Sequence, residues 1–279
     1  MFPLVSTSWL ARKSGSPNLV ILDASMKSVT GDDADFSSRQ YIPGAIVFDL
    51  ERQFSDVACS LPHTAPDYEA FQREVSKLGI ESDSVVVIYD AKGIYSAPRA
   101  WWLFKLMGHE QVYVLDGGLP KWIAEGRAVV ASPVIPESGN GGNNGWQGEY
   151  RTSWIADWRA LAAKAGLPGH HVIDVRSAGR FSGQQPEPRP ELRSGHIPHA
   201  INLPFACYIE DGQYKDPDKL QALFSQKQVF ADDRLYFSCG SGVTACIGLL
   251  AAYLCGYRNL SVYDGSWAEW GQRTDLPVA

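Results

Sequence analysis

The 279-residue chain carries the same series of short segments twice, and this repeat constrains its fold more than any other feature. Four pairs of segments recur in the same order and with similar spacing: VILDAS and VIDVRS, YIPGAIVFDL and HIPHAINLPF, VVVIYD and RLYFSC, VYVLDGGLPKW and LSVYDGSWAEW. Self-similarity along a chain indicates repeated structural units. We therefore expect two similar domains, residues 1–130 and 151–279. Residues 131–150 are rich in Gly, Pro and Asn without periodicity, which is typical of a linker.

Each half combines short apolar runs with helical patterns. The apolar runs of the first half are rich in β-branched residues and suit strands buried on both faces of a parallel sheet; they cover residues 20–22, 45–48, 85–89 and 112–115. Helical patterns cover residues 67–78, 97–107, 157–165 and 243–254. Strands that alternate with helices predict an α/β fold. We expect each half to form a doubly wound, mainly parallel sheet with helices on both faces.

Composition excludes several classes of function. The formal net charge is -6 and no block of Lys and Arg occurs, so nucleic acid is not an expected partner. The longest apolar run, near residues 245–254, is too short to span a bilayer, and the start of the chain has no signal-peptide pattern. We expect a cytoplasmic protein without membrane contact. The five cysteines include no C-x-x-C pair, and we expect neither a metal site nor an organic cofactor.

Residues 236–256, YFSCGSGVTACIGLLAAYLCG, run from a strand pattern through a cysteine and two glycines into an apolar helix. Ligands of open α/β sheets bind beyond the carboxyl ends of the strands, which is where Cys239 lies. Backbone N–H groups and the dipole of the next helix stabilise an anion there, which favours a reactive thiolate. The sequence thus favours Cys239 as a nucleophile. The first half has Asp90 at this place, which suggests one working site and one retired copy.

Other interpretations of this loop fit the sequence less well than a nucleophile does. The glycines fit the G-x-G-x-x-A pattern of a nucleotide site, but room for only about one more strand follows residue 256. A cysteine phosphatase needs an arginine about six residues after the cysteine, where Ala245 stands. No G-x-S-x-G pattern surrounds Ser241, which argues against a serine hydrolase. A buried and inert cysteine stays open as the structural alternative.

The tandem α/β repeat, the cysteine in the second half alone, CGSGVTA, the paired IP-x-A segments and the DG-x-x-x-W segments resemble the two-domain rhodanese-type sulfurtransferases over nearly the whole chain. Members that use thiosulfate carry basic residues after the cysteine, whereas members that use 3-mercaptopyruvate carry C-G-S-G-V-T, as here. The resemblance implies that Cys239 accepts sulfur from 3-mercaptopyruvate as a persulfide and passes it to a thiol, such as that of thioredoxin, or to cyanide. Thiosulfate:cyanide transfer and a non-catalytic persulfide carrier stay open as alternatives.

The resemblance also implies roles for residues outside the cysteine. Arg180 and Arg189 are expected to bind the carboxylate and keto groups of the donor. An Asp49–His63–Ser241 set is expected to relay a proton. Backbone N–H groups of the loop are expected to cradle the transferred sulfur, which assigns a binding role to Gly240, Gly242, Val243 and Thr244. Without the resemblance, the arginines read as surface groups, Asp49 as a turn cap and His63 as a loop residue.

Overall fold

The computed structural model describes residues 2–27, 39–136 and 145–279, and its contacts divide the chain into two compact units. The first unit consists of Met1–Asp56, Ala65–Arg151 and Asp211–Gln213. The second unit consists of Val57–Thr64, Thr152–Glu210 and Tyr214–Ala279. Each unit thus contains one short segment from the other half of the sequence, segment 211–213 in the first unit and segment 57–64 in the second. The domains expected from the sequence are two contiguous halves, so they do not contain this exchange of segments.

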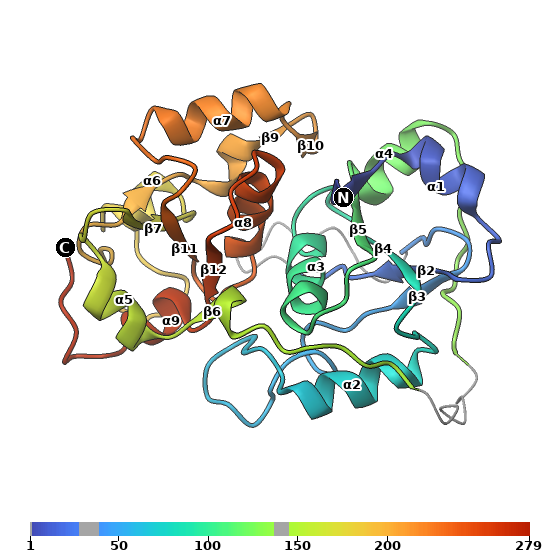
Figure 1. Cartoon of the computed structure of the whole chain (residues 1–279), viewed down its shortest axis with the longest axis horizontal. Helices are drawn as coiled ribbons and strands as arrows, with labels where there is room; N and C mark the ends of the chain where they lie inside the picture. Colours follow the sequence, from blue (N-terminus) through green and yellow to red (C-terminus); the bar gives the residue numbers. More distant parts are fainter. Residues whose placement is uncertain (1, 28–38, 137–144) are drawn as a thin grey trace. The chain divides into compact units, whose positions relative to one another are not determined.

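The first unit is built on a parallel sheet with strand order β1-β5-β4-β2-β3 (Figure 1). Its strands are β1 Leu4–Val5, β2 Leu19–Asp23, β3 Ala45–Val47, β4 Val85–Tyr89 and β5 Val112–Leu115. Four of them lie where the apolar runs predict strands. The runs form central strands because their side chains are buried on both faces of the sheet, as in the pattern of β4 and β5.

Helices cover both faces of this sheet. They are α1 Thr7–Lys13, α2 Tyr68–Lys77, α3 Ala97–Leu106 and α4 Gly118–Ala124. Leu10 of α1 and Trp122 of α4 pack with Val87 of β4 in one core cluster. Successive side chains of a strand point to opposite faces, so Val86 and Ile88 face the other side, where α3 contacts β4. The predicted doubly wound arrangement is confirmed in this unit.

The second unit repeats the same plan, with parallel strands in the order β6-β12-β11-β7-β8. These strands are β6 Ile155–Ala156, β7 His170–Asp174, β8 Ile201–Asn202, β11 Arg234–Ser238 and β12 Leu260–Tyr263. Separately, β9 Ile209–Glu210 and β10 Gln213–Tyr214 form a two-stranded sheet, of which Gln213 belongs to the first unit by its contacts. Corresponding segments of the sequence repeat occupy corresponding places in the two sheets, which confirms that the repeat is structural.

The helical segments of the second unit also cover two faces. They are η2 Thr152–Trp154, α5 Trp158–Lys164, α6 Ala178–Phe181, η3 Phe205–Tyr208, α7 Pro217–Ser225, α8 Ala245–Leu254 and α9 Ser266–Trp270. Leu161 of α5 and Trp267 of α9 pack with Tyr236 of β11 on one face. The apolar helix α8 contacts β11 and β12, and α7 packs on α8. Across the described ranges, each helix falls short of the length and apolarity that crossing a membrane requires.

The predicted linker does not end as its composition suggests. Residues 137–144 lie outside the described residues, but Trp146 is fully buried in the first unit. Its ring lies 5.4 Å from that of Phe71 of α2, and its Nε1 donates a hydrogen bond to Nδ1 of His109 at 3.0 Å. Composition did not predict this contact, because burial of one large aromatic side chain fixes the segment despite the glycines and asparagines around it.

Candidate active site

Cys239 lies between the end of β11 and the start of α8, and only 2% of the residue is exposed. Its backbone is fixed from both sides by the start of α9. The N–H of Cys239 donates to Oγ of Ser266 at 3.1 Å, and its carbonyl accepts from the N–H of Trp267 at 3.0 Å. The Ser266 hydroxyl in turn donates to the carbonyl of Tyr263 at 2.9 Å. These bonds set the direction in which the Cys239 side chain leaves the strand.

Ser266 has an unusual backbone that the sequence alone does not reveal. Its φ angle is +50°, in the left-handed region that favours glycine. The corresponding residue of the first half is Gly118, and its φ angle is also +50°. A serine at this angle is strained, so the backbone conformation does not explain why a serine occurs here. The hydrogen bonds of its hydroxyl do. The repeat offered a signal, because DGG of the first half corresponds to DGS of the second.

The loop after Cys239 leaves backbone donors available for an anion. Gly242 has a φ angle of +80°, which turns the chain tightly before α8 begins at Ala245. No backbone–backbone hydrogen bond of the described residues uses the N–H of Ser241, Val243 or Thr244. No side chain caps the N-terminus of α8 either. A concave run of N–H groups at a helix N-terminus is an anion-binding arrangement.

Arg180 reaches this loop from α6. Its Nη2 lies 3.0 Å from the position that a Cβ atom on Gly240 would take, so glycine leaves room for the guanidinium. The same Nη2 donates to Oε2 of Glu187 at 2.5 Å, and Nε donates to Oε1 at 3.2 Å. This fork fixes the plane of the guanidinium beside the cysteine loop.

Glu187 belongs to a buried series of alternating charges. Its side chain is 1% exposed, and Oε1 also accepts from Nη1 of Arg176 at 2.8 Å. Arg176 pairs in turn with Asp174 at 2.6 Å, at the end of β7. The series therefore leads from the sheet through Arg176 and Glu187 to Arg180. Sequence reasoning missed Glu187, because an acidic residue within PEPRPE looks solvent-exposed.

The other two arginines of this region differ from each other. Arg189 is half-buried, and its side chain forms no hydrogen bond or ion pair within the described part of the chain. Its cation is therefore not neutralised there by a neighbouring carboxylate. The side chain of Arg193 instead donates to four backbone carbonyls, those of Trp270, Gly271, Arg273 and Leu276. Arg193 thus fastens the C-terminal segment behind α9, which is a structural role.

His63 belongs to segment 57–64 and therefore lies within the second unit. Its Nδ1 is 3.0 Å from Oγ of Ser241, and this hydroxyl is buried. Two members of the expected relay are thus hydrogen-bonded to each other. Asp49 belongs to the first unit, where its Oδ1 accepts from the N–H groups of Glu51 and Arg52 at 2.9 and 3.0 Å. The complete relay stays a prediction.

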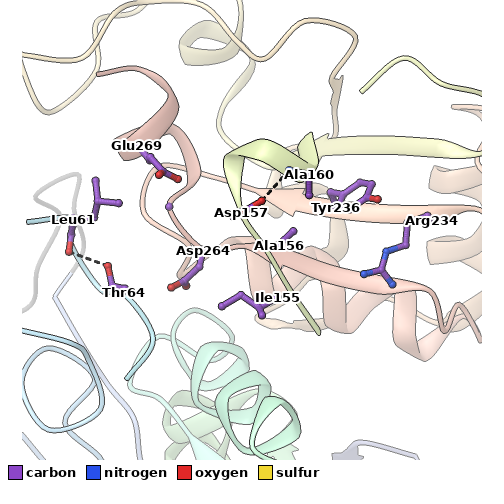
Figure 2. Close-up of a pocket in the computed structure, with 11 residues that line it drawn as sticks. Leu61, Thr64, Ile155, Ala156, Asp157, Ala160, Arg234, Tyr236, Asp264 and Glu269 are labelled. Carbon is purple, nitrogen blue, oxygen red and sulfur yellow. Dashed lines mark hydrogen bonds between the residues drawn. The ribbon is translucent and has the colours of Figure 1, made fainter. Parts of the chain in front are cut away.

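The second unit also contains a pocket of about 560 Å³ that sequence reasoning did not anticipate. Figure 2 shows the residues that line it, which are Leu61, Thr64, Ile155, Ala156, Asp157, Ala160, Arg234, Tyr236, Asp264, Gly265 and Glu269. Burial raises the pKa of Glu269, and the charges of Asp157 and Asp264 raise it further. Across the described residues, no group of His, Cys, Asp and Glu side chains is arranged to hold a metal ion. Two residues of segment 57–64, Leu61 and Thr64, line this pocket. His63 lies between them in the sequence, and its side chain is hydrogen-bonded to Ser241.

Comparison with known proteins identifies this arrangement. Residues 6–125 and residues 157–273 each match the rhodanese-like domain. A solved structure of SseA from Escherichia coli, described as a 3-mercaptopyruvate sulfotransferase with the rhodanese fold, superposes with a TM-score of 0.84 at 32% identity. It covers 96% of this chain and 99% of that one. The chain belongs to the rhodanese family, with two rhodanese-like domains in tandem.

Curated relatives extend over nearly the whole chain. The 3-mercaptopyruvate sulfurtransferase of Escherichia coli K12 is 37% identical over 282 residues, which cover 98% of this chain and 96% of that protein. The thiosulfate sulfurtransferase of Rattus norvegicus is 39% identical over 280 residues, which cover 97% of this chain and 92% of that protein. Sulfur transfer is common to both relatives, and their names differ in the donor.

Proposed function

We propose that this chain transfers sulfur from 3-mercaptopyruvate to a thiol acceptor or to cyanide through a persulfide on Cys239, releasing pyruvate. The observation that carries the proposal is that Arg180 contacts the cysteine loop, which has no charged residue of its own. A doubly charged donor such as thiosulfate favours cations in the loop itself. A donor whose carboxylate is separated from its sulfur by two carbons instead needs a cation beside the loop.

In the first step, the Cys239 thiolate attacks the sulfur of the donor. The new S–S bond forms as the C–S bond breaks, and the electron pair of that bond leaves with the carbon as the enolate of pyruvate. The enolate then takes up a proton. Loop N–H groups from Gly240 to Thr244 stabilise first the thiolate and then the outer sulfur. This is covalent catalysis by an activated nucleophile.

Two groups of side chains assist this step in the proposal. Arg180 and Arg189 bind the carboxylate and keto oxygens, and they stabilise the charge that develops on the enolate. The open side chain of Arg189 and the fixed plane of Arg180 support these roles. The hydrogen bond between His63 and Ser241 supports a proton path to the enolate, and Asp49 completes the proposed relay.

In the second step, the thiolate of an acceptor such as thioredoxin, or cyanide, attacks the outer sulfur. The S–S bond breaks and the Cys239 thiolate is restored. Because the donor product leaves before the acceptor reacts, ping-pong kinetics are expected. The proposal makes residues 151–279 the catalytic domain and residues 1–130 a non-catalytic copy, joined through 131–150. It also assigns the chain to the cytoplasm, which cell fractionation tests.

Thiosulfate is the competing donor, because the rat relative is named a thiosulfate sulfurtransferase. The ratio of kcat/KM for the two donors decides between them, and a strong preference for thiosulfate would contradict the proposal. A carrier without turnover of its own would load sulfur stoichiometrically and stop. Arg189→Ala is expected to impair the use of mercaptopyruvate while sparing thiosulfate, and equal losses for both donors would refute its role as a carboxylate ligand.

Intact mass spectrometry after addition of 3-mercaptopyruvate tests the nucleophile itself. Wild type is expected to gain the mass of one sulfur atom, and Cys239→Ser is expected to gain none. Cys59→Ser is the matched control, because Cys59 is a more exposed free cysteine of the same unit. The control should load like wild type. A sulfur gain in Cys239→Ser equal to that of wild type would show that another residue carries the sulfur.

A further inference from the structure

The pocket of the second unit includes part of the last repeated segment, so the first unit shows what the same place holds in the other copy. The repeated segments VYVLDGGLPKW and LSVYDGSWAEW match Asp116 with Asp264 and Lys121 with Glu269. Asp264 and Glu269 both line the pocket, and Asp264 is buried. The repeat thus exchanges a lysine of the first half for a glutamate of the second.

In the first unit, the lysine lies against the backbone of its repeated segment. A Cβ atom on Gly117 would lie 2.6 Å from Cδ of Lys121, so the side chain crosses this glycine. Nζ of Lys121 donates to Oε1 of Gln213 at 2.6 Å, and Nε2 of Gln213 donates to Oδ2 of Asp116 at 2.9 Å. Gln213 belongs to segment 211–213 of this unit. The carboxylate of Asp116 is therefore linked through an amide to an ammonium group.

In the second unit, a carboxylate takes the place of the ammonium group. A Cβ atom on Gly265 would collide with Oε2 of Glu269, so Glu269 crosses its glycine as the lysine does in the first unit. The segment that this unit takes from the other half is 57–64, and it contributes Leu61 and Thr64 to the pocket. Neither of these side chains is charged. The second unit therefore has two carboxylates beside an open pocket, where the first unit has one carboxylate, an amide and an ammonium group.

The charges around Glu269 favour a cation in the pocket. Burial raises the pKa of Glu269, and the charges of Asp157 and Asp264 raise it further, whereas the charge of Arg273 lowers it. Arg273 is itself paired with Asp275 at 2.7 Å. Burial and like charges both disfavour the ionised form of a carboxyl group, so a bound cation would offset this cost.

The rest of the pocket has a different character. Its middle is lined by apolar and aromatic side chains, those of Ile155, Ala156, Ala160 and Tyr236. Figure 2 shows Arg234 at the opposite end from Glu269 and Asp264. Leu235 pairs with Leu260 in the parallel register, so Arg234 and Asp264 lie roughly 16 Å apart along the strands. A ligand with one cationic end and an apolar body fits this order of side chains, because a second cation at the far end would meet Arg234.

We propose that this pocket binds a primary amine with an apolar body. The ammonium group pairs with Asp264 and Glu269, where the first unit has Lys121, and the body lies along the apolar middle. Hydrogen bonds between ionised partners are stronger than neutral ones and fix the orientation of the ligand. The proposal does not depend on sulfur transfer, because the residues that line the pocket lie outside the cysteine loop.

Isothermal titration calorimetry of the whole chain with three probes at equal ionic strength tests the ligand class. Hexylamine, hexan-1-ol and sodium hexanoate share one aliphatic body and differ in charge. Hexylamine is expected to bind at one saturable site, about 10-fold more tightly than hexan-1-ol, because a hydrogen bond to a charged group contributes about this much. Hexanoate is expected to bind more weakly than hexan-1-ol. Equal affinity of hexylamine and either other probe would overturn the proposal, because the ammonium group would then contribute nothing.

Two variants locate the site. Glu269→Gln keeps the shape of the side chain and removes its charge, so it is expected to weaken hexylamine binding about 10-fold and to leave hexan-1-ol binding unchanged. Ala160→Leu fills the apolar middle and is expected to weaken the binding of both probes. Glu210→Gln is the matched control, because it removes a carboxylate of the same unit that pairs with Lys219 at 2.6 Å on the surface. This control should bind hexylamine like wild type.

Three results would contradict the site. Unchanged hexylamine affinity in Glu269→Gln would remove the carboxylate from it, and unchanged affinity in Ala160→Leu would place the ligand outside the pocket. An equal loss in Glu269→Gln and Glu210→Gln would show that binding follows net charge alone. If circular dichroism shows that Ala160→Leu does not fold, the two charge variants still decide. Sulfur loading of Cys239 on the same variants reports separately on the proposed enzyme activity, so either proposal can fail without the other.

Discussion

Substitutions at Ser266 can separate two effects: the hydrogen bond that its hydroxyl accepts from the Cys239 backbone, and the strain of its own left-handed backbone. The hydroxyl accepts the N–H of Cys239 at 3.1 Å, and the residue is fully buried with a φ angle of +50°. Ser266→Ala removes the hydroxyl and keeps the strain. Ser266→Gly removes the hydroxyl and relieves the strain, because glycine adopts this backbone freely.

The expected changes in stability follow from these two terms. Loss of the hydroxyl leaves a buried N–H without its acceptor, which costs about 1–3 kcal/mol. The left-handed backbone costs a residue with a side chain roughly 1–2 kcal/mol, and Ser266→Gly recovers this amount. We therefore expect Ser266→Ala to be less stable than wild type by about 1–3 kcal/mol. Ser266→Gly should be more stable than Ser266→Ala by about 1–2 kcal/mol.

Catalysis should respond differently from stability. Both variants release the backbone of Cys239, so both are expected to lose about 10- to 100-fold in kcat, since a small misplacement of a reacting group carries a cost of this order. KM for the donor should change little, because Arg180 lies on another element.

Urea unfolding and steady-state kinetics on the same preparations provide the test. Recovery of activity in Ser266→Gly along with its stability would refute the reasoning, because it would trace the loss to strain rather than to the hydroxyl. Equal free energies of unfolding for Ser266→Ala and Ser266→Gly would refute the backbone strain at residue 266.

Two further predictions concern buried polar groups. Glu187→Gln keeps the shape of the side chain but removes the charge that Arg176 and Arg180 share. We expect a loss of about 3–5 kcal/mol in urea unfolding and a raised KM for 3-mercaptopyruvate. An unchanged KM would show that Glu187 does not position Arg180. Burial lowers the pKa of His109 below its ordinary value of 6.5. Nδ1 of the ring accepts a hydrogen bond from Nε1 of Trp146, which requires this nitrogen to be unprotonated. The unfolded chain therefore binds more protons as pH falls below about 6.5, so this part of the stability is complete above that pH and is lost below it. Urea unfolding near neutral and at mildly acidic pH should show a loss of unfolding free energy in wild type and a smaller loss in His109→Gln. An equal pH dependence of the unfolding free energy in the two proteins would exclude His109 as the cause.

Local sequence signals predicted most of the fold. Apolar runs such as residues 85–89 became central strands, and the helical pattern at 97–107 became α3. The place of Cys239 also followed from sequence, because a strand end before a glycine-rich turn is a local feature. The structure brings Arg180, expected from family resemblance, to the same loop. The strands, the helix and the place of Cys239 share a cause, since each depends on residues close together in the chain; the expectation for Arg180 came from family resemblance instead, and its role stays a prediction.

The features that sequence missed depend on burial by tertiary contacts or on backbone angles. Glu187 looks exposed until Arg176 and Arg180 close around it. Trp146 stands in a segment whose composition indicates a linker, yet His109 and Phe71 bury it. The strain at Ser266 becomes visible only through its φ angle. No pattern in a single sequence reports such pairings, because burial of a charge or of a lone aromatic ring is decided by tertiary contacts.

The exchange of segments 57–64 and 211–213 gives the boundary between the halves an evolutionary consequence. After a duplication, the copy without the nucleophile would ordinarily be free to decay or be deleted. Here deletion of the first half also removes His63, the residue that contacts Ser241. A gene split within residues 131–150 would therefore encode two polypeptides that each lack a piece of their own structure. Selection on one half thus preserves the other, and the pair is inherited as a single unit.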